Sequence, residues 1–276
     1  MNFETLWPQL PGPTGWLRAA EGLELYNLAK TRGPKGVIVE IGSWAGRSTI
    51  TLATGSKNGP HTPVYAVDPH RGTYAHRKYN VTETETAFRK NIKKFGVEDL
   101  VKPIIATSVA AAKTWTEPIK LLWIDGHHDY PLIDYLLWEP HLVKGGTIGL
   151  HDIDHYGAIK VVRHLILRST KFTAARRIVF TIFAEKTWPN HSFTPKCSWD
   201  LLFVTVNQWI NVIAKNEATK RPWHDGLPYT WWRGMPKDRF LHELPAQLDP
   251  HKEPAWFKWE PVVRPIQKNQ AGNYPM

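Results

Sequence analysis

The sequence has almost no cysteine: Cys197 is the only one in 276 residues. A single thiol excludes an internal disulfide and a zinc cluster built from several thiolates, and it fits a reducing compartment. Long apolar runs are also missing, because no stretch approaches the roughly 18 consecutive apolar residues of a membrane-spanning helix. Residues 1–16 contain no basic start followed by an apolar run, so no signal peptide is predicted. We therefore expect a cytoplasmic protein without a membrane partner.

Acidic residues are fewer than basic ones, and the formal net charge is +10. Such an excess suits a nucleic acid, a membrane surface or an anionic substrate. The basic residues are scattered, however, with no run of five or six in a row. We therefore favour a soluble protein with a basic surface, and its 42% hydrophobic residues are enough for a sizeable core.

Short apolar runs alternate with helical patterns along most of the chain. Continuous apolar runs are typical of strands buried on both faces, and here they occupy 37–42, 63–68, 101–106, 119–125 and 146–152. Helical patterns occupy 14–32, 82–95, 131–143 and 156–169. Two further strands are expected at 176–184 and 198–206, as a hairpin-like pair at the sheet edge. The alternation predicts an α/β fold with a doubly wound, mostly parallel, seven-stranded sheet.

The composition changes near residue 217. The remaining segment is rich in Pro and Trp and has few periodic patterns. Disordered segments are poor in aromatic residues, so we interpret 217–276 as an irregular arm that wraps the 1–216 domain or a neighbouring subunit. An aromatic arm of this kind also favours a homo-oligomer.

A glycine-containing turn follows the first expected strand, in the segment EIGSWAGRS at 40–48. Glycines at a strand-to-helix turn let the backbone approach a ligand, and the helix that follows offers free N–H groups. The segment does not fit the dinucleotide pattern G-x-G-x-x-G. The second strand ends in Asp68, where a carboxylate is suited to bind both hydroxyls of a ribose. Together these features predict a nucleoside site.

Five segments in order carry a family resemblance: EIGSWAGRS, AVDPH, ATS, IDGHHDY and GGTIGLHD. Over about residues 14–206 the chain resembles the class I S-adenosylmethionine-dependent methyltransferases. The nearest subgroup is the O-methyltransferases of small molecules and sugars, which are related to catechol O-methyltransferase-like and cephalosporin-hydroxylase-like proteins. The resemblance implies a Rossmann-like methyltransferase fold, S-adenosylmethionine as cofactor, and a hydroxyl of a small molecule or sugar as acceptor.

The resemblance also assigns cofactor residues by position. Those expected around the methionine part are Glu40, Gly42, Ser43, Gly46 and Ser48. Asp68 would hold the ribose, and Thr107 and Ser108 would lie beside the adenine. Asp125, Gly126 and His127 would line the same pocket.

Carboxylates and imidazoles gather where the fourth and fifth strands end, in DGHHDY at 125–130 and HDIDH at 151–155. In the resembling families the matching positions bind a divalent cation, Mg²⁺ or Mn²⁺, which here assigns Asp125, His151 and Asp152. Catechol O-methyltransferase has an acid where His151 stands, and a histidine ligand would favour Mn²⁺, Fe²⁺ or Zn²⁺. Two alternatives stay open: His151 acts as an acid–base or supporting residue, or the two carboxylates bind backbone amides or substrate without an ion.

Methyl transfer to a hydroxyl requires that the acceptor lose its proton. The resemblance assigns the catalytic roles to Asp125 and to His128, three residues later, where sugar methyltransferases carry a histidine. A neutral imidazole is suited to accept a proton near pH 7. His70 and His76 are interpreted as ordinary loop residues.

Three other functions compete with this one. A nucleic-acid methyltransferase would explain the basic charge, but the segment after the fourth strand lacks the Asn/Asp-Pro-Pro-Tyr-like motif of enzymes that methylate exocyclic amines. A metal-dependent hydroxylase-like enzyme would use the histidine-rich site with iron. A non-catalytic assembly protein would keep the fold and bind no cofactor.

Overall fold

A computed structural model describes residues 1–12, 16–72, 83–127, 131–153, 166 and 171–187. Its strands are β1 (Val37–Ile41), β2 (Val64–Val67), β3 (Val101–Ile104), β4 (Ile119–Ile124), β5 (Leu142–Leu150), β6 (Phe172–Ile178) and β7 (Thr181–Lys186). Its helices are α1 (Phe3–Leu6), η1 (Trp7–Gln9), α2 (Ala19–Lys30), α3 (Arg47–Lys57), α5 (Glu85–Lys94), α6 (Ser108–Ala112), α7 (Pro131–Trp138) and η2 (Glu139–His141).

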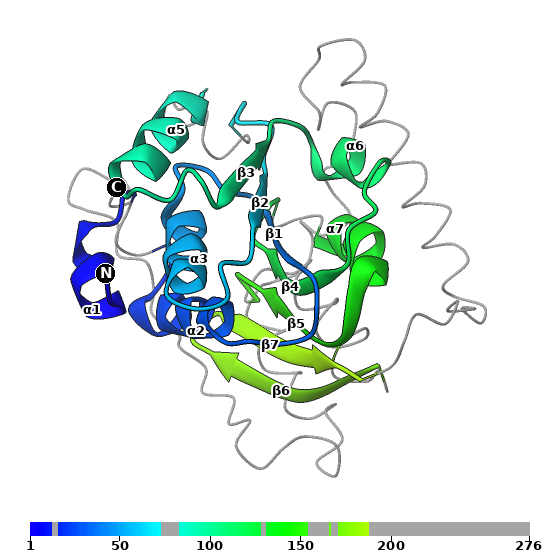
Figure 1. Ribbon diagram of the computed structural model, residues 1–276. Coiled ribbons are helices and arrows are strands. Elements are labelled where there is room, and N and C mark those ends of the chain that lie inside the picture. Colours follow the sequence, from blue (N-terminus) through cyan, green and yellow to red (C-terminus); the bar gives the residue numbers. More distant parts are fainter. Residues whose placement is uncertain (13–15, 73–82, 128–130, 154–165, 167–170, 188–276) are drawn as a thin grey trace, which may run out of the picture.

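The strands form one seven-stranded sheet in the order β3-β2-β1-β4-β5-β7-β6 (Figure 1). β1 to β5 are parallel, and β7 runs antiparallel to both of its neighbours. The chain leaves β1 toward β2 and β3, then crosses back to place β4 on the other side of β1. Ligands of open α/β sheets bind at such a reversal, beyond the carboxyl ends of the strands.

Helices cover both faces of the sheet and bury two separate apolar clusters. On one face α2, α3 and α5 contribute Leu25, Ile50 and Phe88 to a cluster with the sheet (Figure 1). On the other face α6 and α7 contribute Ala111 and Trp138. The central strands are therefore buried on both sides, which explains why their sequences are mostly apolar and do not alternate strictly.

The predicted α/β class, the seven strands and the first five strand positions are confirmed, whereas several boundaries were wrong. The run at 176–184 is not one strand: it holds a turn at Val179 and Phe180 between β6 and β7. The helix expected at 131–143 ends at Trp138, because β5 already begins at Leu142. The strand expected at 198–206, most of the helix at 156–169 and the arm at 217–276 lie outside the described residues.

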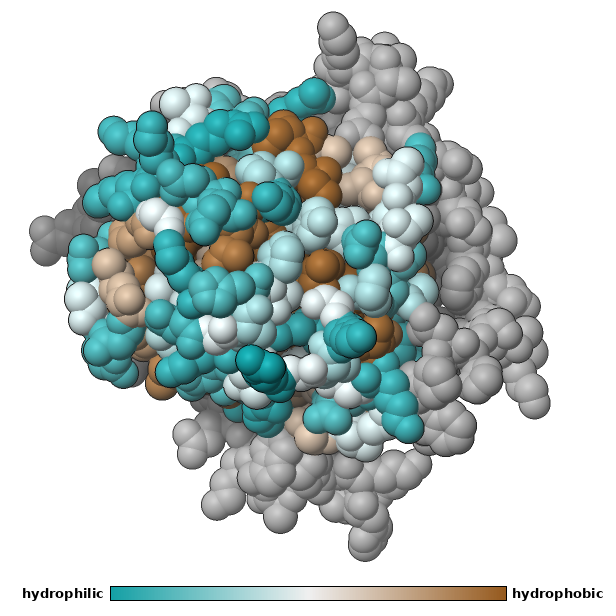
Figure 2. Space-filling model, viewed as in Figure 1, coloured by the Kyte–Doolittle hydropathy of each residue, from teal (hydrophilic) through white to brown (hydrophobic). Residues whose placement is uncertain are grey.

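Apolar side chains take up little of the one face drawn in Figure 2. The face drawn in Figure 2 is largely hydrophilic, and hydrophobic residues show on it as small separate areas over the region of β3 and α3. No helix among the described residues is long and apolar enough to cross a membrane. Most of the larger apolar side chains of the described residues are buried in the two clusters beside the sheet.

Candidate functional site

The carboxyl ends of β1, β2, β4 and β5 meet at one edge of the sheet. The ladder hydrogen bonds continue past the strand ends: the Gly42 amide donates to Val67 O (2.9 Å), and the Asp125 amide donates to Ile41 O (2.8 Å). The His151 amide donates to Ile124 O (3.0 Å). These bonds bring the four expected motifs side by side at the point where the strand order reverses.

The loop after β1 needs its two glycines. Gly42 and Gly46 have φ angles of 91° and 92°, in the left-handed region that favours glycine. A Cβ atom at Gly42 would lie 2.3 Å from the carbonyl oxygen of Asp125, so the loops after β1 and β4 touch through backbone atoms. Gly46 is also the N-cap of α3, and no side chain caps this helix start. The amides of the first turn of α3 are therefore suited to an anionic group.

Asp68 ties this loop to the end of β2. Its Oδ2 accepts hydrogen bonds from the backbone amides of Ser43 (3.0 Å) and Trp44 (2.9 Å), and its Oδ1 accepts one from the amide of His70 (2.7 Å). Each carboxylate oxygen has two lone pairs, so Oδ1 keeps capacity for a ligand hydroxyl. Asp68 has a structural role here in addition to the ribose contact expected from its position.

Glu40 is completely buried at the end of β1. Burial raises its pKa to about 8, although the nearby hydroxyls of Ser48 and Thr49 act to lower it, and the hydroxyl of Thr49 donates a hydrogen bond to Oε2. Within the described part of the chain, Glu40 Oε1 and the buried Ser43 Oγ have no hydrogen-bond partner. Buried polar atoms are seldom left unsatisfied, so these two atoms fit a site for a polar ligand.

The two residues expected near adenine start α6. Thr107 is the N-cap, and its Oγ1 accepts from the amide of Ala110 (3.2 Å). The hydroxyl of Ser108 donates to Asp134, a buried residue of α7 whose pKa burial raises to about 7. Asp134 also lies beside Gly126, because a Cβ there would be 3.2 Å from Asp134 Oδ2. Asp134 thus joins the loops after β3 and β4, a role that its ordinary position in a helical pattern did not reveal.

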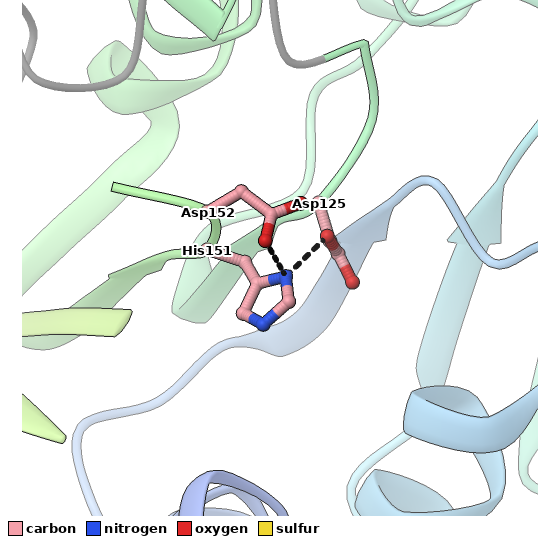
Figure 3. A group of neighbouring side chains, drawn as sticks. All are labelled: Asp125, His151 and Asp152. Atoms are coloured by element: carbon pink, nitrogen blue, oxygen red, sulfur yellow. Dashed lines mark hydrogen bonds and ion pairs between the residues drawn. The ribbon is translucent and has the colours of Figure 1, made fainter. Parts of the chain in front are cut away.

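The acidic and histidine residues after β4 and β5 form a compact group (Figure 3). His151 Nδ1 lies 2.9 Å from Asp125 Oδ1 and 3.4 Å from Asp152 Oδ1. One donor atom from each of the three residues lies within 4.8 Å of the other two, a spacing compatible with a shared cation. The three residues predicted as metal ligands from their positions are therefore brought together.

A residue outside the sequence prediction completes this group. Glu21 of α2 is fully buried, and its Oε2 lies 3.5 Å from His151 Nε2. Burial alone lowers the pKa of His151, but Asp125, then Glu21 and Asp152, outweigh it and raise this pKa well above the usual value. The neighbouring carboxylates therefore favour the protonated imidazole. In the sequence, Glu21 lies four residues before Leu25, on the apolar side of the helical pattern expected at 14–32, but no pattern indicated its contact with His151.

Three of the six described non-glycine residues with positive φ lie at the same edge. Trp44, His70 and Asp152 have positive φ angles of 44°, 51° and 50°, and each follows the end of a different strand. Residues other than glycine hold this conformation only when the surroundings impose it, and such positions cluster at functional sites. The predicted base His128 lies outside the described residues, whereas His127 is described and half-buried.

Comparisons with known proteins agree with this geometry. Residues 39–153 match the family model described as "Methyltransferase domain". The crystal structure of cofactor-bound Rv0187 from MTB is similar, with 21% identity over 64% of this chain and 84% of that chain and a TM-score of 0.50. The O-methyltransferase NovP is similar with 16% identity over 62% and 81% of the two chains and a TM-score of 0.52. Residues 39–153, which run from within β1 to just beyond β5 and include the residues at the sheet edge, thus match the methyltransferase domain family, and the solved structures share the fold of the chain.

Proposed function

We propose that this protein transfers the methyl group of S-adenosylmethionine to a hydroxyl of a small molecule or sugar. The observation that carries the proposal is the placement of Asp125, His151 and Asp152 directly beside the glycine loop after β1. Carboxylates and an imidazole at this position suit the activation of a hydroxyl, and the loop suits the cofactor. The similarity to NovP, an O-methyltransferase, agrees with oxygen as the acceptor atom.

S-adenosylmethionine supplies an electrophilic methyl group on a sulfonium, and the residues of this chain bind and orient it. Glu40 Oε1 and Ser43 Oγ are the buried atoms suited to its ammonium group, since both lack a partner among the described residues. The uncapped start of α3 suits its carboxylate. The spare lone pair of Asp68 Oδ1 suits a ribose hydroxyl, and Thr107 and Ser108 suit the adenine side of the pocket.

The acceptor hydroxyl must lose its proton before or during attack. A divalent cation bound by Asp125, His151 and Asp152 would lower the pKa of a coordinated hydroxyl. The donor set fits such an ion, with two carboxylates and one imidazole nitrogen close enough to share it. The role of base stays with His128, as predicted from its place three residues after Asp125.

The first test is isothermal titration of the metal-free protein with S-adenosylmethionine and S-adenosylhomocysteine. We expect micromolar binding by the wild type and at least tenfold weaker binding by Asp68→Asn, because one amide oxygen cannot replace two carboxylate oxygens. Asp99→Asn, the same change at an exposed position, is the matched control. No binding of either compound by folded wild type would overturn the proposal.

The second test measures release of S-adenosylhomocysteine from a panel of catechols and monosaccharides, with and without Mn²⁺. Turnover with a panel member that falls at least a hundredfold in Asp125→Asn and in His128→Ala supports the assignment of these residues. Unchanged turnover in either variant removes that residue from the proposal. Binding of the cofactor is checked in each variant, so that a loss of chemistry is separated from a loss of cofactor.

A further inference from the structure

The buried carboxylate of Glu21 comes from a helix that precedes the matched domain. Its Oε1 accepts from the amide of Phe180 (2.9 Å) and from the hydroxyl of Thr181 (2.9 Å), and its Oε2 accepts from the amide of Arg18 (2.8 Å). It also faces His151 Nε2 at 3.5 Å. Glu21 is thus held rigidly from three sides, at the edge of the imidazole that is opposite Asp125 and Asp152.

We propose that Glu21 is a positioning residue for a divalent-metal centre, and that the centre takes Mn²⁺ or a similar nitrogen-accepting cation in preference to Mg²⁺. In this arrangement Glu21 Oε2, at 3.5 Å, is the carboxylate oxygen that faces the buried Nε2 of His151, which has no hydrogen-bond partner among the described residues, and Nδ1 is the ligating nitrogen beside Asp125 and Asp152. The inference rests on the metal-assisted form of the proposed function, and it adds the identity of the ligating atom, the class of cation and the residue that sets both.

The distances around Nδ1 suit adjacent ligands of one ion. Bonds of about 2.1 Å at right angles place neighbouring donors about 3 Å apart. Nδ1 lies 2.9 Å from Asp125 Oδ1 and 3.4 Å from Asp152 Oδ1, close to that spacing. Nε2 points away from both carboxylates and toward Glu21 (Figure 3 shows the two ring nitrogens). Only Nδ1 is therefore placed to share a cation with these two residues.

A carboxylate behind a histidine is the usual outer partner of a metal-bound imidazole. It accepts the second ring N–H, which selects the tautomer, fixes the ring orientation and makes the ligating nitrogen more basic. An imidazole nitrogen also favours Mn²⁺, Fe²⁺, Co²⁺ or Zn²⁺ over Mg²⁺, which prefers oxygen donors and retains its waters. The hydrogen bonds that fix the Glu21 carboxylate would thus orient the His151 ring so that Nδ1 faces the metal.

The test titrates the full-length protein with Mn²⁺ alone and with Mg²⁺ alone, and records pulsed electron paramagnetic resonance of the Mn²⁺ complex. Wild type is compared with Glu21→Gln and with Thr181→Val. The second variant removes another contact of Glu21 but leaves the carboxylate facing His151, so it reports a purely structural effect. If Glu21→Gln does not fold, Glu21→Asp, which keeps the charge but shortens the reach, takes its place.

We expect a nitrogen coupling in the wild-type Mn²⁺ spectrum and at least tenfold tighter binding of Mn²⁺ than of Mg²⁺. In Glu21→Gln, Mn²⁺ binding weakens 10- to 100-fold and the coupling is lost or reduced, while Mg²⁺ binding changes less. Thr181→Val retains the wild-type values.

Three results would overturn the inference: no Mn²⁺ binding by wild type, binding without nitrogen coupling, or equal Mn²⁺ affinity in wild type and Glu21→Gln. Equal losses in Glu21→Gln and Thr181→Val would also overturn it, because they would mean that Glu21 only holds the turn between β6 and β7. Titration of the same metal-free samples with S-adenosylhomocysteine shows separately whether cofactor binding, and with it the proposed methyl transfer, survives.

Discussion

Glu40→Gln should stabilise the free protein and weaken its hold on the cofactor. In the folded chain the pKa of Glu40 is about 8, compared with an ordinary value of 4.5. Between these pH values the folded protein holds one proton more than the unfolded chain, so the free energy of unfolding falls as the pH rises. The decrease in unfolding free energy is complete above pH 8. From the difference between the two pKa values, its total size is about 5 kcal/mol.

Glutamine removes this titration while keeping the shape of the side chain. Its amide oxygen still accepts from the hydroxyl of Thr49, but its NH₂ group stands where Glu40 Oε1 has no partner among the described residues. That unsatisfied group offsets part of the gain. We therefore expect the unfolding free energy to rise by about 2 kcal/mol at pH 9, and by clearly less at pH 5.

The assay is chemical denaturation of wild type and Glu40→Gln at pH 5, 7 and 9, with the buried Glu139→Gln as the matched control. Glu139 lies 2.8 Å from the ammonium of Lys186, which is itself buried. The control should lose stability at every pH, because it leaves Lys186 without its opposite charge. Destabilisation of Glu40→Gln at pH 9, or the same pH dependence as wild type, would refute the reasoning.

Cofactor binding should respond in the opposite direction. A bound ammonium group favours the charged form of Glu40, so S-adenosylhomocysteine should bind wild type more tightly as the pH rises from 6 to 8. Glu40→Gln should bind at least tenfold more weakly at pH 8 and lose this pH dependence, since a charge-assisted hydrogen bond contributes about 1.5–3 kcal/mol. An unchanged pH profile in the variant would remove Glu40 from the cofactor site.

Two further substitutions test the packing around the site and the sheet. Gly42→Ala places a methyl group 2.3 Å from the carbonyl oxygen of Asp125 at a φ of 91°, so it should cost about 3 kcal/mol or more of unfolding free energy. Gly96→Ala, at a φ of 62° with no atom nearby, should cost only about 1 kcal/mol in the same denaturation experiment; equal costs would contradict the proposed close contact. Lys186→Met should cost about 2 kcal/mol, because Glu139 loses its buried partner but keeps Lys171 at 3.3 Å, and part of the cost should be recovered when Glu139→Gln is added, because both buried charges are then gone. A double variant less stable than either single one would count against this ion-pair account.

Much of the fold follows from local patterns. The runs at 37–42 and 119–125 are mostly apolar, without strict alternation, because both faces of these strands are covered, and that pattern can be seen without the structure. The sequence also placed the polar motifs at the ends of the fourth and fifth strands, and parallel strands end at the same edge of a sheet. The prediction of one strand at 176–184 was wrong for a physical reason. Its residues favour a strand throughout, but the chain turns at Val179 and Phe180. Glu21 stabilises this turn by accepting a hydrogen bond from the amide of Phe180, 159 residues away in the sequence.

The sequence by itself determined the order of the elements, the glycine loop and the donor types at the sheet edge, because these depend on residues close together in the chain. Tertiary structure decided which partners the buried acids have. Glu21 and Asp134 occupy ordinary helical patterns, yet both are buried against loops far away in the sequence. Burial and nearby charges set the charge state of a carboxyl or an imidazole, and both depend on contacts between distant segments. The chemistry expected of Glu40 and His151 was therefore decided by the fold.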